Sequence, residues 1–256
     1  MENKRGSSNP VFAKIERDIV DVQGYGASYK GITLKTLLLL LLVVVSGVAS
    51  LLLLVNYPNV FIALFFVAMI LGFISVMIAS ASPRLAPTFS IIYALCEGMW
   101  LGTLTLIVSL AIPEFPVAFV AVLVTLGIFV AMLVLYSTKL VVASSRFRRV
   151  MFGISFSIIA VFITVGIVSI FDNGALWYAM FGNAYSPLVL FITLLLILYG
   201  SFMLVINFDN AKMIVSTGAD KKYEWAVSLG LLVSIIYIYV QVIRLIIIIY
   251  ARTRRD

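Results

Sequence analysis

The sequence predicts an all-α polytopic membrane protein with seven transmembrane helices. Of its 256 residues, 63% are hydrophobic and 11% are charged, and the mean hydropathy is +1.18. A soluble domain needs more polar side chains than this to cover its surface. The apolar residues also gather in seven long runs, each close to the roughly 20 residues that a helix needs to cross the hydrocarbon core of a bilayer.

The seven runs are continuously apolar, which favours helices over barrel strands, where apolar residues alternate over about ten residues. They lie at Leu37–Val55, Val60–Ser80, Thr88–Ile112, Phe115–Ser137, Val150–Phe171, Pro187–Ile206 and Ala226–Ala251. We therefore expect one seven-helix transmembrane domain, residues 37–251. A polar tail of residues 1–36 precedes it, and a short basic tail of residues 252–256 follows it.

The polar residues 1–36 come before the first apolar run. That run is too long and starts too late for a cleaved signal peptide, so we expect the tail to stay attached. Within the tail, Val11–Val22 is compatible with a short amphipathic helix along the membrane surface. Loose structure is an equally good interpretation of the same residues.

Charges in the connections predict the orientation. The connection Lys139–Arg149 has four basic residues and no acidic one, Arg84 precedes the third run, and the tail is rich in Lys and Arg. The connections at 56–59, 113–114 and 172–186 have no Lys or Arg. The positive-inside rule then predicts a multi-pass protein of the cell membrane with a cytoplasmic N-terminus. The net charge of +7 indicates this topology and attraction to anionic lipid rather than nucleic-acid binding.

The last run contradicts this rule. Seven crossings from a cytoplasmic N-terminus place Arg252, Arg254 and Arg255 outside the cell. A re-entrant last segment would return them, but Leu231–Tyr250 contains no Gly or Pro at which a hairpin could turn. Seven spans are favoured, and the re-entrant segment is the alternative.

One face of the last run is polar. Gly230, Ser234, Tyr237, Gln241 and Arg244 follow one another at alternating steps of four and three. Polar groups are costly in hydrocarbon and usually face a bundle interior or a wet cavity. We therefore expect the seventh helix to be buried along this face, with Ser234 and Tyr237 as intramembrane polar support.

Glu97 and Arg244 are the main charges within the apolar runs. At about 1.5 Å per residue, Glu97 lies about 14 Å from the inner end of its run, close to the midplane. A Glu97–Arg244 contact would compensate both charges. In the alternative, Arg244 extends to the outer surface and Glu97 is protonated. Beside Glu97, Gly98 and Gly102 form a small-xxx-small pattern that indicates close helix packing.

The composition excludes several functional classes. The chain has no histidine, which excludes His-based metalloproteases, serine–histidine pairs and the usual haem ligand, so we expect no enzyme. Its single cysteine, Cys96, allows no intrachain disulfide and no thiolate metal cluster. We expect no cofactor and no metal site of high affinity.

Several short motifs are spread along nearly the whole chain. They are Ser8-Asn9-Pro10-Val11-Phe12, Tyr93-Ala94-Leu95-Cys96-Glu97-Gly98 with Leu101-Gly102, Arg146-Phe147-Arg148-Arg149, Asn207-Phe208-Asp209, Glu224-Trp225 and Tyr237-Ile238-Tyr239-Val240-Gln241-Val242-Ile243-Arg244-Leu245. Each motif is weak alone. In this order and spacing they resemble the Bax-inhibitor family of membrane proteins, in its bacterial branch.

The resemblance implies a central seventh helix wrapped by two three-helix layers, and a pH-sensitive calcium leak. In such relatives an acid at the end of the sixth helix and an acid in the seventh share a proton that switches the pore. Asp209 matches the first acid, and Arg84 is a possible latch for it. Taken alone, Asp209 would be interpreted as a solvated loop charge. Gln241 matches the second acid, and an amide has no proton to share, so acid sensing should be altered or weakened.

The function expected is a slow cation leak, with calcium as the transported ion. Calcium prefers several oxygen ligands, and the spans offer few carboxylates, so binding should be weak and transient. The alternative is a non-conducting regulator that binds another membrane protein, such as a quality-control protease. The basic connections and the tail would then form the contact surface.

Overall fold

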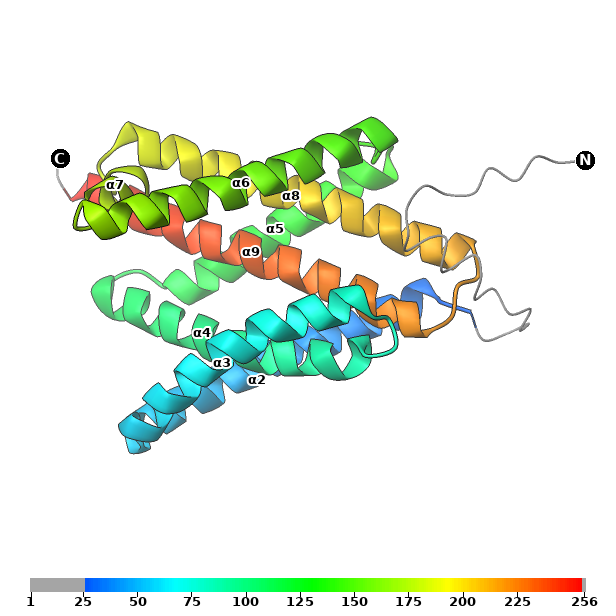
Figure 1. The fold of residues 1–256 in the computed structure, drawn as a ribbon, viewed down its shortest axis with the longest axis horizontal. Coiled ribbons are helices and arrows are strands. Elements are labelled where there is room, and N and C mark those ends of the chain that lie inside the picture. The colour runs from blue at the N-terminus through cyan, green and yellow to red at the C-terminus, as the bar shows by residue number, and fades with distance from the viewer. Residues whose placement is uncertain (1–25, 255–256) are drawn as a thin grey trace, which may run out of the picture. The chain divides into compact units, whose positions relative to one another are not determined.

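The computed structural model describes residues 26–254. Within them, seven helices are long and apolar enough to cross a membrane. They are α2 (Tyr29–Asn56), α3 (Pro58–Ala81), α4 (Ala86–Ala111), α5 (Val117–Ser137), α6 (Ser145–Phe171), α8 (Pro187–Ser216) and α9 (Lys222–Thr253) (Figure 1). The predicted all-α class and the seven apolar helices are confirmed. The proposed helix at Val11–Val22 lies outside the described residues.

Several helices extend beyond the apolar runs. α2 begins at Tyr29 rather than Leu37, α6 begins at Ser145 rather than Val150, and α8 continues to Ser216 rather than Ile206. An apolar run marks only the part of a helix that lies in the hydrocarbon core. The helix itself continues until a capping residue ends it. The Ser28 hydroxyl caps α2 by accepting a hydrogen bond from the Gly31 N–H at 3.0 Å.

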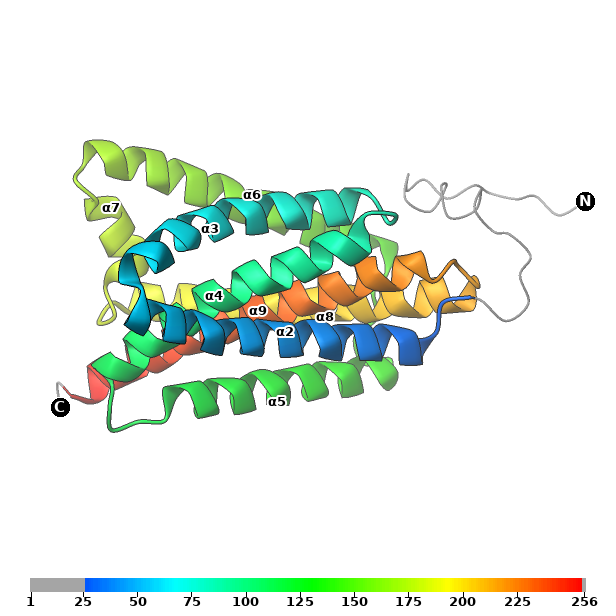
Figure 2. The ribbon, with the colours of Figure 1, turned by 90° about the horizontal axis from the view of Figure 1, so that it is seen from below.

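The connection between α6 and α8 has its own helical turns. α7 (Ala175–Trp177) leads into the π-helix η1 (Tyr178–Gly182), and Figure 2 shows both between the end of α6 and the start of α8. The turn after α6 needs Gly174 because its φ of 82° lies in the left-handed region. A carboxylate oxygen of Asp172 accepts a hydrogen bond from the Leu176 N–H at 2.8 Å and fixes the start of these turns.

The chain divides into two compact units. Unit 1 comprises Met1–Trp100 and Asp209–Leu232, and unit 2 comprises Leu101–Phe208 and Val233–Asp256. α4, α8 and α9 each contribute a segment to both units.

In unit 1, α2 approaches α4 closely. A Cβ at Gly98 would meet the carbonyl oxygen of Val43 and would lie 2.9 Å from the Cβ of Ser46. On α3, a Cβ at Gly72 would lie 3.3 Å from the Cβ of Cys96. Glycine at these positions lets the helix backbones pack at short range, as is common in membrane proteins.

In unit 2, α8 and α9 run antiparallel and in contact. The Asn207 side-chain amide donates a hydrogen bond to the Ser234 hydroxyl at 2.8 Å. Seven residues earlier on α8, a Cβ at Gly200 would lie 2.7 Å from the Tyr237 ring and 2.9 Å from the Ile238 side chain. Gly200 therefore allows the Tyr237 ring to lie against the backbone of α8.

The end of α9 lies beside the connection that precedes α8. The Arg252 guanidinium donates hydrogen bonds to the carbonyl oxygens of Ala184 at 3.3 Å, Tyr185 at 3.4 Å and Ser186 at 2.9 Å. Since α9 is unbroken from Lys222 to Thr253, it supports seven crossings over the re-entrant alternative. The three carbonyl partners compensate the charge of Arg252 at this end of α9.

Burial differs strongly between the spans. In its most apolar stretch α9 has 44% of its residues buried, the largest share of the seven, whereas α6 has 6%. Ser234 and Gln241 on the polar face of α9 are buried, and Tyr237 and Arg244 are half-buried. α9 is therefore the most buried of the seven spans, with α8 next at 39%, and most of α6 is available to lipid or to another protein.

Candidate functional site

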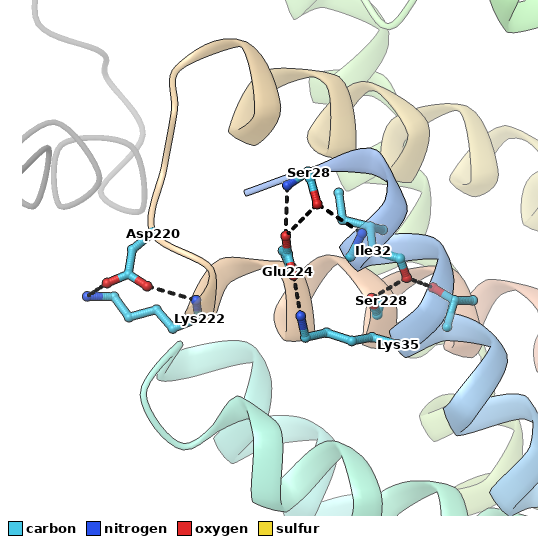
Figure 3. A network of polar contacts seen from close by, with 9 residues as sticks. Ser28, Ile32, Lys35, Asp220, Lys222, Glu224 and Ser228 are labelled. Carbon is cyan, nitrogen blue, oxygen red and sulfur yellow. Dashed lines mark hydrogen bonds and ion pairs between the residues drawn. The ribbon is translucent and has the colours of Figure 1, made fainter. Parts of the chain in front are cut away.

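The first turn of α9 carries a buried carboxylate in unit 1. Glu224 is 1% exposed. It accepts hydrogen bonds from the Ser28 backbone N–H at 2.7 Å and from the Ser28 hydroxyl at 3.3 Å, and it forms an ion pair with Lys35. Figure 3 shows these groups of α2 and its N-cap converging on Glu224. We call Ser28, Lys35 and Glu224 the Glu224 cluster.

The surroundings of the Glu224 cluster are tightly packed. A Cβ at Gly31 would overlap with the Glu224 carboxylate, so a larger residue would displace this carboxylate from its contacts with Ser28 and Lys35. One turn further along α9, the Ser228 hydroxyl donates a hydrogen bond to the Ile32 carbonyl oxygen at 3.0 Å (Figure 3). These contacts hold the start of α2 against the start of α9.

The Glu224 cluster is an anchor rather than a reaction centre. Removing one partner of a buried ion pair typically costs about 3–5 kcal/mol because the other charge stays buried without compensation. The lower end of that range applies here, since Lys35 is 20% exposed. The Lys35 ammonium also lies 5.6 Å from the ring centroid of Trp225, a distance that allows a cation–π interaction.

Sequence reasoning missed the Glu224 cluster. The sequence drew attention to Glu224 only as part of the Glu224-Trp225 motif. Lys35 was one of the basic residues of the tail that predict the orientation in the membrane. The two residues are 189 positions apart in the chain. A partial signal exists, because Gly31 and Lys35 lie four residues apart and therefore share one face of α2.

In unit 2, polar side chains of α8 and α9 contact one another. Besides the Asn207–Ser234 hydrogen bond, the ring of Tyr237 packs edge-on against the ring of Tyr199, with centroids 5.7 Å apart. The Tyr199 hydroxyl shares a hydrogen bond of 2.8 Å with Ser155 of α6. A line of hydroxyl and amide groups thus follows the polar face of α9.

Two oxygens on this face have no partner among residues 26–254. They are the Tyr237 hydroxyl and the Gln241 side-chain carbonyl, and both are buried. The residues lie about one helical turn apart on the same face. Buried polar atoms are normally paired, so both oxygens are available to accept a hydrogen bond from water.

Arg244 lies one turn further along α9 than Gln241. Its guanidinium donates a hydrogen bond to the Phe181 carbonyl oxygen at 2.7 Å and lies 5.3 Å from the Phe181 ring centroid. A π-helical turn of the α6–α8 connection therefore holds this charge. Glu97 belongs to unit 1 and Arg244 to unit 2, so the Glu97–Arg244 pair stays a prediction.

The remaining predicted site residues are divided between the units. Asp209 and Arg84 belong to unit 1, and Arg84 is exposed in the turn before α4. Gln241 and Gly102 belong to unit 2. The Asp209–Gln241 pair and the Arg84 latch stay predictions. Within residues 26–254, no three Cys, Asp or Glu side chains are close enough together to hold a metal ion.

A comparison with known families matches residues 9–251 to the family described as Bax inhibitor 1 like. The chain belongs to this family. The match covers nearly the whole sequence, and the seven apolar helices of this Bax-inhibitor-like protein agree with a multi-pass protein in a lipid bilayer. Searches among curated proteins and among solved structures gave no match.

Proposed function

We propose that this Bax-inhibitor-like protein mediates a slow cation leak, with Ca²⁺ as the ion, across the cell membrane. The observation that carries the proposal is the pair of unpaired buried oxygens, Tyr237 Oη and Gln241 Oε1, on the most buried span. Neutral oxygens bind a hard cation weakly, and conduction requires an ion that also leaves easily. The Asn207–Ser234 contact continues the polar line along α9.

Acid sensing in this protein is weak compared with a pair of coupled carboxylates. Gln241 supplies a carbonyl oxygen and an amide but no titratable proton. Two neighbouring carboxylates would share a proton because their like charges repel. Asp209 then acts without an acidic partner at position 241. The basic connection at 139–149 supports a cytoplasmic N-terminus.

Calcium flux into dye-loaded liposomes tests this proposal. We expect a slow flux above that of protein-free liposomes, with a shallow pH dependence that Asp209→Asn alters. Gln241→Asp should steepen the pH dependence because it restores a second carboxylate. Gln241→Asn is the matched control, since it keeps the amide and should keep the shallow profile. Absence of flux at every pH, in protein shown to be folded, would refute the leak.

A second function is supported by the exposed face of α6. Gly153, Ser157 and Ala160 form a strip of small residues on this face, and nothing lies within 4 Å of a Cβ built at Gly153. Small residues let another transmembrane helix approach closely. A non-conducting regulator that binds a membrane protein, such as a quality-control protease, would use this strip. Gly153→Leu should then abolish co-purification of the partner and leave calcium flux unchanged.

A further inference from the structure

An open groove runs along unit 2 between α6 and α8. Its volume is about 460 Å³, within the range of small-molecule sites. Fourteen residues of α6, η1 and α8 line it, and among them only Ser157 and Tyr199 carry a side-chain hydroxyl or amide. We call it the α6–α8 groove. Its lining matches a hydrocarbon chain rather than a polar ligand.

The length of the α6–α8 groove corresponds to one leaflet of a bilayer. On α6 the lining extends from Met151 to Phe162, which is roughly 16 Å at 1.5 Å per residue. Half of a hydrocarbon core of about 30 Å is roughly 15 Å. At the far end the rings of Phe162 and Phe181 stack, with centroids 4.8 Å apart and an angle of 7° between their planes.

The other end of the groove lies beside the basic start of α6. The ring of Phe147 packs edge-on against Phe202, a lining residue, with centroids 5.6 Å apart. At about 100° per residue, Arg146 and Arg148 lie about 100° to either side of Phe147 around α6. Arg149 lies about 200° from Phe147, on the opposite face of α6. Around the helix, Arg146 and Arg148 are therefore nearer than Arg149 to the face that lines the groove.

We propose that the α6–α8 groove binds an anionic phospholipid from the leaflet on the side of the 139–149 connection. One acyl chain lies along the groove, and the phosphate lies between Arg146 and Arg148. Guanidinium groups form strong charge-assisted hydrogen bonds to phosphate, and the positive end of the α6 dipole lies at the same place. A choline headgroup would bring its own cation against the two arginines.

Native mass spectrometry of the purified full chain in detergent tests the headgroup. Phosphatidylglycerol and phosphatidylcholine with identical acyl chains are added at equal concentration. We expect a preference for phosphatidylglycerol of roughly thirtyfold, since each of the two arginines near an anionic lipid contributes about 1 kcal/mol. Arg146→Gln with Arg148→Gln should reduce the preference to near one. Lys139→Gln with Arg149→Gln removes the same charge from the same segment and should keep most of it.

A second pair of variants tests the groove itself. Ile158 lines the groove, whereas its neighbour Ile159 is 55% exposed and lies outside the lining. Ile158→Phe should fill the groove and reduce binding of both lipids several-fold, and Ile159→Phe should leave both unchanged. The headgroup preference compares two lipids on the same protein sample, so partial unfolding of an arginine variant does not imitate its expected result. For Ile158→Phe, a thermal unfolding midpoint equal to that of Ile159→Phe distinguishes a filled groove from partial unfolding.

Three outcomes would overturn the proposal. Equal binding of the two lipids to the parent protein would remove the headgroup site. An equal loss of preference in both double variants would indicate diffuse attraction by the basic segment. Unchanged lipid binding in Ile158→Phe would show that the acyl chain lies elsewhere.

Discussion

At the residue scale, the structure shows what a few side chains do for the spans. Glu224 is a charge that can be buried because Ser28, the N-cap of α2, provides two hydrogen bonds and Lys35 of α2 provides an ammonium group. Tyr237 and Gln241 are the opposite case, since their oxygens are buried without a partner in the described chain. A buried polar group that has a partner contributes to stability. A buried polar group without a partner lowers stability, and a functional role can explain why the protein keeps it.

Gly31→Ala tests the packing around Glu224. The new methyl group would overlap with the carboxylate, so we expect a loss of about 1–2 kcal/mol despite the better helix propensity of Ala. Thermal unfolding in detergent should show a midpoint lower by several degrees. Gly153→Ala is the matched control because its Cβ meets open space, and it should not lower the midpoint. Equal midpoints for both variants would contradict the close contact.

Tyr237→Phe tests the unpaired oxygens. Losing one oxygen on the conduction path should reduce calcium flux about three- to tenfold, the kinetic equivalent of about 0.7–1.4 kcal/mol. Tyr239→Phe is the control, because this hydroxyl is already paired with Thr105 at 2.9 Å. A flux that falls equally in the two variants would count against a role of Tyr237 in conduction.

At the element scale, helix ends are defined by caps and by contacts that apolar runs do not report. α2, α6 and α8 all extend into polar sequence, because backbone hydrogen bonds continue until a cap satisfies the terminal groups. The end of α9 is fixed differently, by Arg252 on three carbonyl groups of the connection before α8. One arginine thus joins two elements more than sixty residues apart in the chain.

Arg252→Gln tests this junction. We expect a loss of about 1–3 kcal/mol, because charged hydrogen bonds to backbone carbonyls are lost. Hydrogen exchange should speed up in the amides of residues 175–186. Arg254→Gln is the control, since the exposed Arg254–Glu114 pair at 3.6 Å contributes little. Unchanged exchange in Arg252→Gln would show that the junction does not order the connection.

At the scale of the whole molecule, the main features are seven spans and a last helix more buried than the others. The contacts of Arg252 place the end of α9 on the side of the connection at 172–186. The connection at 139–149 lies at the other end of α6. All of these residues belong to unit 2. The end of α9 and the connection at 172–186 should therefore be labelled from the same side of the membrane, and the connection at 139–149 from the other side.

Single cysteines test the number of crossings. In a Cys96→Ala background, we expect a membrane-impermeant maleimide to label Ala175→Cys and Thr253→Cys in intact cells, because seven crossings from the proposed cytoplasmic N-terminus place both outside. Val142→Cys should react only after permeabilisation. All three positions are exposed in the structure. Labelling of Thr253→Cys together with Val142→Cys would restore the re-entrant alternative.

The sequence by itself determined the fold class, the seven spans, the polar face of the last helix and the resemblance to the family. These features depend on hydrophobic length and periodicity, which are local along the chain. The tertiary structure alone decided that Glu224 pairs with Lys35, that Asn207 meets Ser234, and that Arg244 is held by Phe181. It also revealed the α6–α8 groove. Such contacts join residues far apart in the chain, and only the packing of the helices determines which faces meet.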